Sequence, residues 1–311
     1  MSICVFGSLN MDMLMGVVKL PLPGETVRSK SYELLAGGKG GNQAIAVARQ
    51  NVPVQMVGRV GYDDYGNRLL DSLEKESIGV DGVVLDTQAS TGLAVIAVAD
   101  TGENQIILSA GANGNMGPDD VARLKPLLPK TKYLMLQLEV PLKTVTEAAK
   151  AAKEAGVKVI LDPAPATAIA NEELFELVDI ITPNQTEANR LCSFPVLTPQ
   201  DALSAAKAIQ KRGIPEVVVT LGEHGSFCAT ADAAIAVPPY RVTALDTTAC
   251  GDAFNGAMVA ALYQGRSFFE ACQWGNAAGA LTATRPGTQI SIPHHFELEG
   301  FLSEHAARQP D

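Results

Sequence analysis

The sequence has few basic residues and few aromatic side chains. Lys and Arg number 24 against 34 Asp and Glu, the formal net charge is −10, and no run of basic residues occurs. A nucleic acid or an anionic membrane is therefore not expected as a partner, because the overall field repels both. Any polyanionic ligand must instead be held locally, by backbone N–H groups and a bridging metal ion.

Cysteines with the spacing of a disulfide framework or a zinc site are also absent. The chain has five cysteines, an odd number without any C-x-x-C pair. We therefore expect neither kind of site and predict a reducing, cytoplasmic setting. The cysteines are Cys4, Cys192, Cys228, Cys250 and Cys272.

Signals for a membrane span, a leader or a covalent nucleophile are missing as well. No 18 consecutive residues are apolar, so no membrane span is predicted. The opening residues, MSICVFGSLNMD, have no basic segment before an apolar one, so no signal peptide is expected. The four histidines show no metal-ligand spacing, and no Ser/His/Asp or Cys/His pattern occurs. The stretch VFGSLNMD lacks G-x-G-x-x-G, which disfavours a dehydrogenase.

Short apolar runs alternate with segments of helical periodicity. The runs are 2–7, 53–61, 133–138, 157–162, 178–182 and 216–222, and the clearest helical segments are 143–156 and 199–213. Because the runs are continuously apolar, we expect strands that are buried on both faces. The sequence thus predicts one α/β domain over 1–311, with a doubly wound, mainly parallel sheet sandwiched by helices. Its ligands should lie beyond the carboxyl ends of the strands.

Two stretches depart from this alternation. Residues 91–110 read as a hairpin whose turn is Asp100-Thr101-Gly102-Glu103, and residues 12–36 read as extended segments interrupted by PLPGE. Together they predict a small separate sheet, a β-lid projecting over the site. A sheet without covering helices needs a partner, so a lid or a dimer contact is expected there.

The stretch DTTACGDAFNGAMVAALYQG, residues 246–265, places Asp252 where a small-residue turn opens into a helix. In one interpretation Asp252 only caps the helix and meets the positive end of its dipole. In the other, the free N–H groups form an anion site and Asp252 acts on a ligand bound there. The stretch alone does not decide between them.

A second glycine-rich stretch, AGGKGGNQAIAVARQ at 36–50, surrounds Lys39 with glycines and then enters a helix. It matches neither common phosphate-binding signature, so it is either a flexible turn or a place where the backbone approaches a polar ligand, with Asn42 able to donate and accept. Near the first strand, Asn10 and Asp12 lie two apart and share one side of an extended chain. They suit a polyol, although a solvated turn explains them equally well.

Further polar residues follow predicted strands. Glu139 ends the run YLMLQLE at the edge of the sheet where ligands bind, although edge residues are commonly polar. In TPNQTE, Asn184 precedes Glu187 by one helical turn, which fits a capping box or hydrated Mg²⁺ held near phosphates. TLGEHG, residues 220–225, is a strand followed by a glycine-flanked turn, a weak nucleotide signal on its own.

Taken together and in this order, these motifs closely resemble the ribokinase family of PfkB-type carbohydrate kinases. The glycine-rich signature lies at 37–50 and the Asp-Thr-x-x-x-Gly-Asp signature at 246–259, and the resemblance covers essentially the whole chain. It implies a ribokinase-like fold with a β-lid that often pairs two subunits into a homodimer. It also implies an ATP-dependent sugar kinase.

The resemblance assigns roles to individual residues. Asp252 would be the general base for the sugar's primary hydroxyl as it attacks the γ-phosphoryl group of ATP. The backbone N–H groups of Ala249, Cys250 and Gly251 would form an anion hole for the transferring group. The residues implied to bind the sugar are Asn10, Asp12, Gly38, Lys39, Asn42, Glu139 and Asp252.

The resemblance also implies a nucleotide site and two cations. Asn184 and Glu187 would organise Mg²⁺ and the phosphates, largely through water. ATP would contact Asn184, the turn 220–225 with Thr220, Gly222 and Gly225, then Gly251 and Asn276. A monovalent cation, usually K⁺, would lie by the anion hole, in part on backbone carbonyls. Its matching positions are Asp246, Thr248, Thr282, Arg285, Gly287 and Ser291.

Two positions depart from the family pattern. The residue before Gly251 is usually Ala or Gly, and here it is Cys250. A thiol at a helix N-terminus is expected to have a lowered pKa, so we hypothesise that thiol reagents inactivate the protein through Cys250. At Asn276 the family's prototype has a histidine near adenine, and its loss is expected to weaken or broaden nucleotide choice.

The resemblance implies D-ribose as acceptor, phosphorylated at the 5-hydroxyl. The alternatives are sister kinases acting on deoxyribose, fructose or a nucleoside. Asn10 favours ribose over deoxyribose, and the few aromatics disfavour a nucleoside, which needs a stacking pocket. A non-catalytic sugar-binding protein on the same fold is expected to lack Asp252 or the small-residue turn, and both are present.

Overall fold

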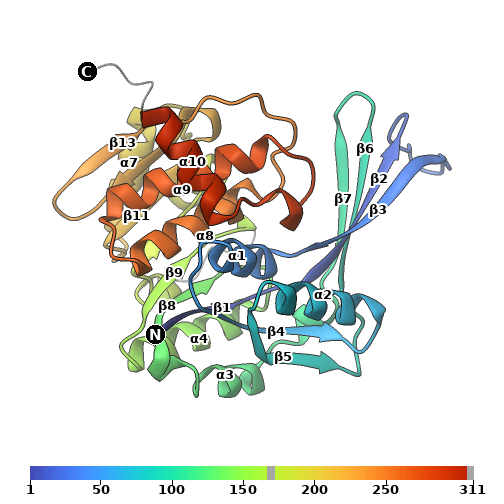
Figure 1. Cartoon of the computed structure of the whole chain (residues 1–311), viewed down its shortest axis with the longest axis horizontal. Coiled ribbons are helices and arrows are strands. Elements are labelled where there is room, and N and C mark those ends of the chain that lie inside the picture. The colour runs from blue at the N-terminus through green and yellow to red at the C-terminus, as the bar shows by residue number, and fades with distance from the viewer. Residues whose placement is uncertain (167–171, 307–311) are drawn as a thin grey trace.

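The structure is a computed structural model that describes residues 1–166 and 172–306. Its main feature is a sheet in the order β13-β12-β11-β10-β9-β8-β1-β4-β5 (Figure 1). The strands from β11 to β5 pair in parallel, while β12 and β13 extend the sheet beyond β11 by antiparallel pairing. Their bounds are β1 (Ser2–Phe6), β4 (Val54–Gly61), β5 (Gly79–Asp86), β8 (Thr131–Leu136), β9 (Lys158–Leu161), β10 (Ile180–Ile181), β11 (Glu216–Thr220), β12 (Ser226–Ala229) and β13 (Ala234–Val237).

Successive residues of the central strands point to opposite faces of this sheet, and both faces are apolar. In β1, Ile3 and Val5 belong to one buried cluster, and Cys4 and Phe6 belong to the other. The first cluster is covered by α1 (Lys39–Ala48), α2 (Asp64–Lys75), α8 (Cys250–Tyr263), α9 (Phe268–Ala283) and α10 (His295–Ala306). The second is covered by α3 (Pro118–Leu124), α4 (Leu142–Glu154), α5 (Glu172–Phe175), α6 (Gln185–Cys192) and α7 (Pro199–Gln210). The predicted sandwich is therefore confirmed.

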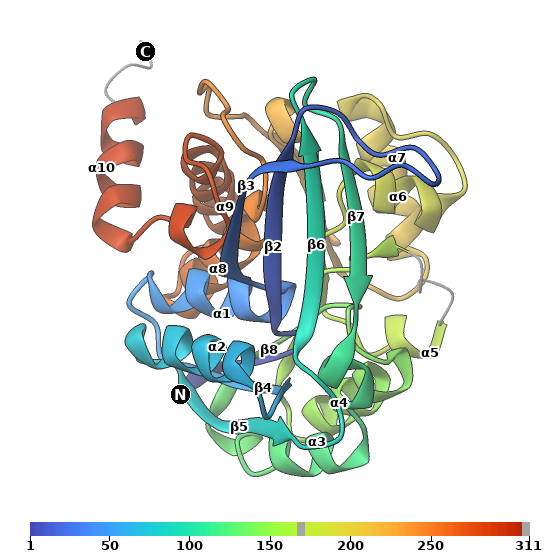
Figure 2. The ribbon, with the colours of Figure 1, turned by 90° about the vertical axis from the view of Figure 1, so that its right-hand side faces the viewer.

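A second sheet stands apart from this body in Figure 1 and is seen face-on in Figure 2. Its order is β3-β2-β6-β7, with bounds β3 (Ser29–Gly37), β2 (Asn10–Val17), β6 (Gly92–Ala99) and β7 (Asn104–Ser109). The predicted small sheet and its 91–110 hairpin are confirmed. The sheet begins two residues earlier than predicted, at Asn10, so both Asn10 and Asp12 belong to its strand β2.

The strand ends account for the position of the site. In the segment predicted as helical over 199–213, α7 ends at Gln210 and the chain turns at Gly213, whose φ of 100° suits glycine. The run predicted as 216–222 ends at Thr220, because Gly222 turns with φ 56°.

Within residues 1–166 and 172–306, no helix has both the length and the apolar character needed to cross a bilayer.

Candidate active site

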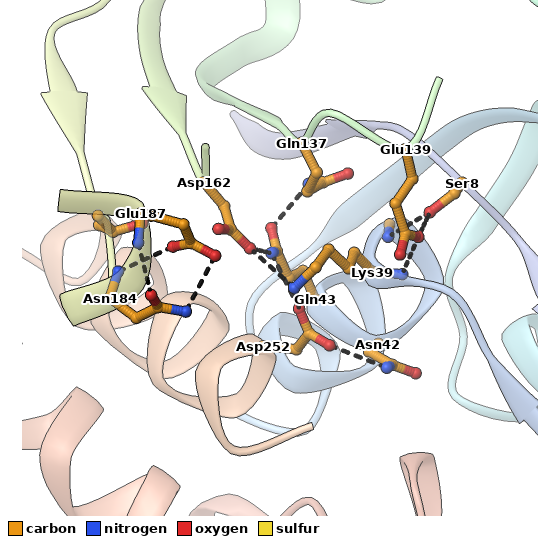
Figure 3. Close-up of polar contacts among 12 residues, drawn as sticks. Ser8, Lys39, Asn42, Gln43, Gln137, Glu139, Asp162, Asn184, Glu187 and Asp252 are labelled. Carbon is orange, nitrogen blue, oxygen red and sulfur yellow. Dashed lines mark hydrogen bonds and ion pairs between the residues drawn. The ribbon is translucent and has the colours of Figure 1, made fainter. Parts of the chain in front are cut away.

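Asp252 lies in the first turn of α8, at the end of the large sheet beyond β8 and β9 (Figure 3). Ala249 precedes the helix with a left-handed φ of 59°, and no side chain caps the helix. The N–H of Cys250 makes one long bond, 3.4 Å to the carbonyl of Thr247, and among the described residues the N–H groups of Ala249 and Gly251 have no backbone acceptor. Asp252 is therefore not a helix cap, and the amides beside it face outward.

The carboxylate of Asp252 is instead held by two amide side chains of α1. Asn42 donates from Nδ2 to Oδ2 at 2.9 Å, and Gln43 donates from Nε2 to Oδ1 at 3.1 Å. Asp252 is only 5% exposed. The Oδ1 atom of Asn42 is buried without a hydrogen-bond partner, so it remains available to accept from a ligand hydroxyl.

Lys39 is the cation of the site. Its Nζ lies 3.6 Å from Oδ2 of Asp162 and 3.9 Å from Oδ1 of Asp252 (Figure 3). Burial alone would lower the pKa of Lys39, but the surrounding carboxylates, led by Asp162 and Asp252, raise it instead. Lys39 is thus firmly charged.

Asp162 follows β9 and lies at the same edge of the sheet. Burial raises its pKa to about 7, although the nearby Lys39 ammonium favours its charged form. The predicted sugar contacts did not include Asp162, and the predicted role of Lys39 did not include an ion pair. The presence of Asp162 in the site and its ion pair with Lys39 both arise because the end of β9 lies beside the start of α1.

Glu139 lies three residues beyond the end of β8. Its Oε2 accepts from the hydroxyl of Ser8 at 2.5 Å and from the backbone N–H of Lys39 at 3.1 Å. The side chain therefore ties the loop after β1 to the start of α1. One carboxylate oxygen, Oε1, has no hydrogen bond among the described residues and can accept from a ligand.

Asn10 and Asp12 project from the base of β2. Asn113, in the 3₁₀ turn η1 (Gly111–Asn115), donates from Nδ2 to Oδ1 of Asn10 at 2.8 Å, which leaves the NH₂ group of Asn10 for a ligand. Burial, reinforced by the negative charges of Glu139 and Asp252, raises the pKa of Asp12 to about 7. A Cβ at the neighbouring Gly37 would lie 2.1 Å from Asp12 Oδ2, so only glycine leaves room for this carboxylate.

The glycine-rich stretch at 36–50 packs tightly against the loop after β1. Gly38 precedes α1 with φ 85°, and a Cβ there would lie 2.6 Å from the backbone nitrogen of Asn10. A Cβ at Gly40 would lie 2.7 Å from the backbone of Ser8. The stretch is thus a close approach of two backbones, not a flexible turn.

Asn184 and Glu187 form the predicted capping box at the start of α6. Asn184 Oδ1 accepts from the N–H of Glu187 at 2.9 Å, and Glu187 Oε2 accepts from the N–H of Asn184 at 2.8 Å. Burial raises the pKa of Glu187, against the hydrogen bonds from Asn184 and the charge of Lys39. The pair is set next to β11 by a bridge between Asn184 and Thr220.

The turn after β11 is shaped by two glycines with positive φ. Gly222 and Gly225 have φ of 56° and 83°, and a Cβ at Gly225 would lie 2.3 Å from the carbonyl of Val237. Asn276, on α9, donates from Nδ2 to the carbonyls of Val237 and Pro238 at 3.3 and 3.2 Å. Asn276 thereby links α9 by hydrogen bonds to the end of β13, which lies beside the turn.

The predicted cation positions come from two segments that hydrogen bonds join. Asp246 Oδ2 accepts from the N–H of Gly287 at 2.9 Å, and its Oδ1 accepts from the N–H of Thr248 at 2.9 Å. Partial burial opposes ionisation, but these bonds hold the pKa of Asp246 below its usual value. The hydroxyls of Thr282 and Ser291 donate to backbone carbonyls, and Arg285 pairs with Glu297 at 2.7 Å. The side chain of Arg285 is therefore engaged elsewhere.

Protein side chains alone do not build a metal cage here. In the described parts of the chain, no group of three or more His, Cys, Asp or Glu side chains could hold a metal ion. Mg²⁺ fits this donor set only together with phosphates, because it keeps most of its waters and takes one or two carboxylates.

The lowered pKa predicted for Cys250 is wrong, whereas its reactivity toward thiol reagents stays a prediction. Burial, together with the negative charges of Asp246 and Asp252, raises the pKa of this thiol to about 12. The free N–H groups of the helix start do not compensate for two carboxylates and a desolvated sulfur. Cys250 is a thiol that resists ionisation.

Four residues of the site were not predicted from the sequence: Ser8, Gln43, Gln137 and Asp162. Gln43 bridges Asp162 and Asp252, and Gln137 donates to Gln43 at 2.7 Å. A signal was present for two of them. Asp162 is the last residue of the run 157–162, and Gln137 precedes Glu139 by two residues, which places both at the edge where ligands bind.

Known proteins are similar to this chain in sequence and in fold. Residues 1–295 match the model of the pfkB family of carbohydrate kinases. A ribokinase from Haemophilus influenzae is 40% identical over 305 residues, covering 98% of this chain and 99% of that protein. A deoxyribokinase from Salmonella typhi is 34% identical, covering 97% of this chain and 99% of that protein.

A solved structure is similar over the same length. Arabidopsis thaliana ribokinase, complexed with ribose and ATP, matches with a TM-score of 0.89 and 33% identity, covering 97% of this chain and 98% of that one. The chain belongs to the pfkB family of carbohydrate kinases. The family resemblance and the fold class predicted from its motifs are therefore confirmed, and the chain is a sugar kinase, a phosphotransferase that uses a nucleotide.

Proposed function

We propose that this chain transfers the γ-phosphoryl group of ATP to the 5-hydroxyl of D-ribose, with Asp252 as general base. One observation carries the proposal. Asp252 lies beside outward-facing amides at the start of α8, yet its oxygens bond to Asn42 and Gln43 and not to its own helix. A carboxylate placed this way can take a proton from a hydroxyl while the amides bind phosphate oxygens.

The sugar would be held between β2, α1 and the loop after β8. The NH₂ group of Asn10 and the free oxygens of Asn42 and Glu139 offer complementary donors and acceptors to a polyol. Asp12 adds an acceptor, and the backbone at Gly38 and Lys39 closes the site. This set suits a sugar with all its hydroxyls, which favours ribose over deoxyribose.

Transfer itself would rely on positioning and charge. The amides of Ala249, Cys250 and Gly251 would bind the transferring phosphoryl group, and a Cβ at Gly251 would meet nothing within 4 Å, so space remains there. The ammonium of Lys39, beside Asp252, would offset the charge that develops on the phosphoryl oxygens. Asp252 would accept the proton late, as the hydroxyl attacks.

The nucleotide would run from this helix start toward the β11 turn. The proposed contacts are Asn184, Thr220, Gly222, Gly225, Gly251 and Asn276. Mg²⁺ would arrive with ATP and be held through water by Glu187, and it supplies neutralisation of phosphate charge. A K⁺ ion would lie by the anion hole and be held in part by backbone carbonyl oxygens. Its proposed positions are Asp246, Thr248, Thr282, Arg285, Gly287 and Ser291.

Asp252→Asn tests the role of the base. The variant should bind ribose and ATP yet lose turnover by about 10²- to 10⁴-fold, because the amide cannot accept the proton. Calorimetry of binding and steady-state kinetics with ribose, deoxyribose and fructose, each with Mg·ATP and with or without K⁺, check this. Near-normal turnover would refute the role of Asp252, and a preference for deoxyribose or fructose would refute the substrate.

The small sheet is proposed as a homodimer contact, in a cytoplasmic protein that meets ATP inside the cell. Its outer strand β7 exposes Ile106, Ile107 and Leu108, at 59%, 73% and 50%. Ile107→Lys should shift sedimentation from dimer to monomer. Leu197→Lys, at a 69% exposed site on the body, is the matched control and should leave the dimer intact. A wild-type monomer would contradict the proposal.

A further inference from the structure

Gln43 occupies a position that the reaction described above does not use. It lies in α1, is only 1% exposed, and places its amide between two carboxylates (Figure 3). Its Nε2 donates to Asp162 Oδ2 at 2.8 Å and to Asp252 Oδ1 at 3.1 Å. A single NH₂ group therefore bridges the proposed base and a second buried acid.

The orientation of this amide is fixed by chemistry. Two carboxylates face Gln43, so only its NH₂ end can point toward them, and its carbonyl must point away. That carbonyl, Oε1, accepts from Nε2 of Gln137 at 2.7 Å. The remaining oxygen of Gln137 is buried without a partner, and a Cβ at Gly7 would lie 1.9 Å from it.

Stability alone does not explain Gln137. A buried carbonyl without a hydrogen bond is unfavourable, and a glycine must be kept at position 7 to admit the side chain. What Gln137 does accomplish is to hold the amide of Gln43 in the one orientation that serves both carboxylates.

We propose that Gln43 is a positioning residue for Asp252, and that Gln137 fixes the orientation of the Gln43 amide. The inference rests on the proposed function, in which Asp252 is the base. Asn42 takes one oxygen of Asp252 and Gln43 takes the other, so the pair sets the plane of the carboxylate. Hydrogen bonds to both oxygens also stabilise its ionised form, which is the form that accepts a proton.

This stabilisation matters because negative charge is dense here. The charged or titratable groups around Asp252 are Lys39, which favours its ionised form, and Asp12, Glu139, Asp162, Glu187 and Cys250. One lysine faces several acids, so the hydrogen bonds from Asn42 and Gln43 are the further favourable partners of the Asp252 carboxylate.

Gln43→Leu removes both N–H groups at nearly constant volume. The turnover number, kcat, at neutral pH should fall about 10- to 100-fold, and the acid limb of its pH profile should move up by about one pH unit. Raising the pH should therefore restore part of the lost turnover. KM for ribose should change less than about threefold, because Asp252 is the one proposed sugar contact that Gln43 hydrogen-bonds, and the contacts at Asn10, Asp12 and Glu139 are left in place.

The matched control is Gln50→Leu. Gln50 is also 1% exposed, follows the same helix, and donates from Nε2 to the carbonyl of Pro293 at 3.0 Å. Its loss should lower the midpoint of thermal unfolding but leave the acid limb of kcat in place. Gln137→Met provides a second test if Gln43→Leu does not fold, and its acid limb should move in the same direction by a smaller amount.

The outcomes separate this inference from the proposed function. If Asp252→Asn retains turnover, the proposed function fails and the inference fails with it. If Asp252→Asn is inactive while Gln43→Leu and Gln137→Met keep the wild-type acid limb, only the inference is overturned. An acid limb that moves in the glutamine variants and not in Gln50→Leu establishes it.

Discussion

The proposed sugar side and the proposed nucleotide side of the site are built in different ways. On the sugar side, the buried side chains of Asn42, Gln43 and Asp252 hold one another through hydrogen bonds. On the nucleotide side, Gly251 and the turn that begins at Gly222 present backbone atoms at the surface. If the proposed sites are right, side-chain geometry is fixed in advance where the new bond is made, while exposed backbone supplies much of the proposed nucleotide contact.

The unfavourable free energy of burying acidic side chains falls mainly on the proposed sugar side. Asp12 and Asp162 are kept as buried acids near other acids, and both have a pKa of about 7. Sites that must bind and react commonly retain such unfavourable groups at the expense of stability. The predictions below test whether the two sides differ as stated, in order of expected effect.

The largest effect concerns Asp12 and pH. Its folded pKa of about 7 exceeds the unfolded value of 3.8, so the protonated form is favoured by folding. Its contribution is fully present below pH 3.8 and is lost as pH rises to about 7, by roughly 1.4 kcal/mol per pH unit at most. Asp12→Asn should remove this dependence.

Urea unfolding of both proteins between pH 4 and pH 8, without sugar, measures this. The two free energies of unfolding should agree near pH 4 and diverge toward pH 7, with the variant the more stable. Parallel curves would show that burial of Asp12 is not unfavourable, and the sugar side would then carry no such cost.

A pair of glycine substitutions sharpens the comparison. Gly40→Ala places a methyl group 2.7 Å from the backbone of Ser8, whereas Gly251→Ala meets nothing within 4 Å. Gly40→Ala should lower the free energy of unfolding by about 1–3 kcal/mol through overpacking. Gly251→Ala should leave stability within about 0.5 kcal/mol but raise KM for ATP, because its methyl group points into the space proposed for phosphate.

Denaturation and steady-state kinetics distinguish the two. Equal losses of stability would contradict the view that one glycine is packed and the other open. An unchanged KM for ATP in Gly251→Ala, with folding intact, would remove Gly251 from the nucleotide site.

The smallest effect concerns Cys250. Because its pKa is raised to about 12, iodoacetamide at pH 8 should label it slowly, and Cys250→Ala should keep turnover within a few fold. The rate of inactivation by the reagent should be the same in wild type and variant. Rapid inactivation that Cys250→Ala abolishes would restore the hypothesis drawn from the sequence.

The sequence was sufficient for the sheet, the lid and most polar residues at strand ends. Apolar runs and glycine turns are local, and residues such as Glu139 and Asn184 follow strands that must share one edge. It could not show the bridge at Gln43, whose partners lie 119 and 209 residues away and meet it only through the fold. The pKa of Cys250 was misjudged because its largest cause is burial of the thiol, which depends on how the chain folds around it.

Strand β2 has one further consequence. It pairs with β3 and β6 along its whole length, yet its first residues, Asn10 and Asp12, face the proposed sugar site. A tilt of the small sheet would displace both side chains, since they belong to one of its paired strands. If sugar binds there as proposed, its occupancy and the angle of that sheet are thermodynamically linked, and whatever fixes one of them biases the other by an equal free energy.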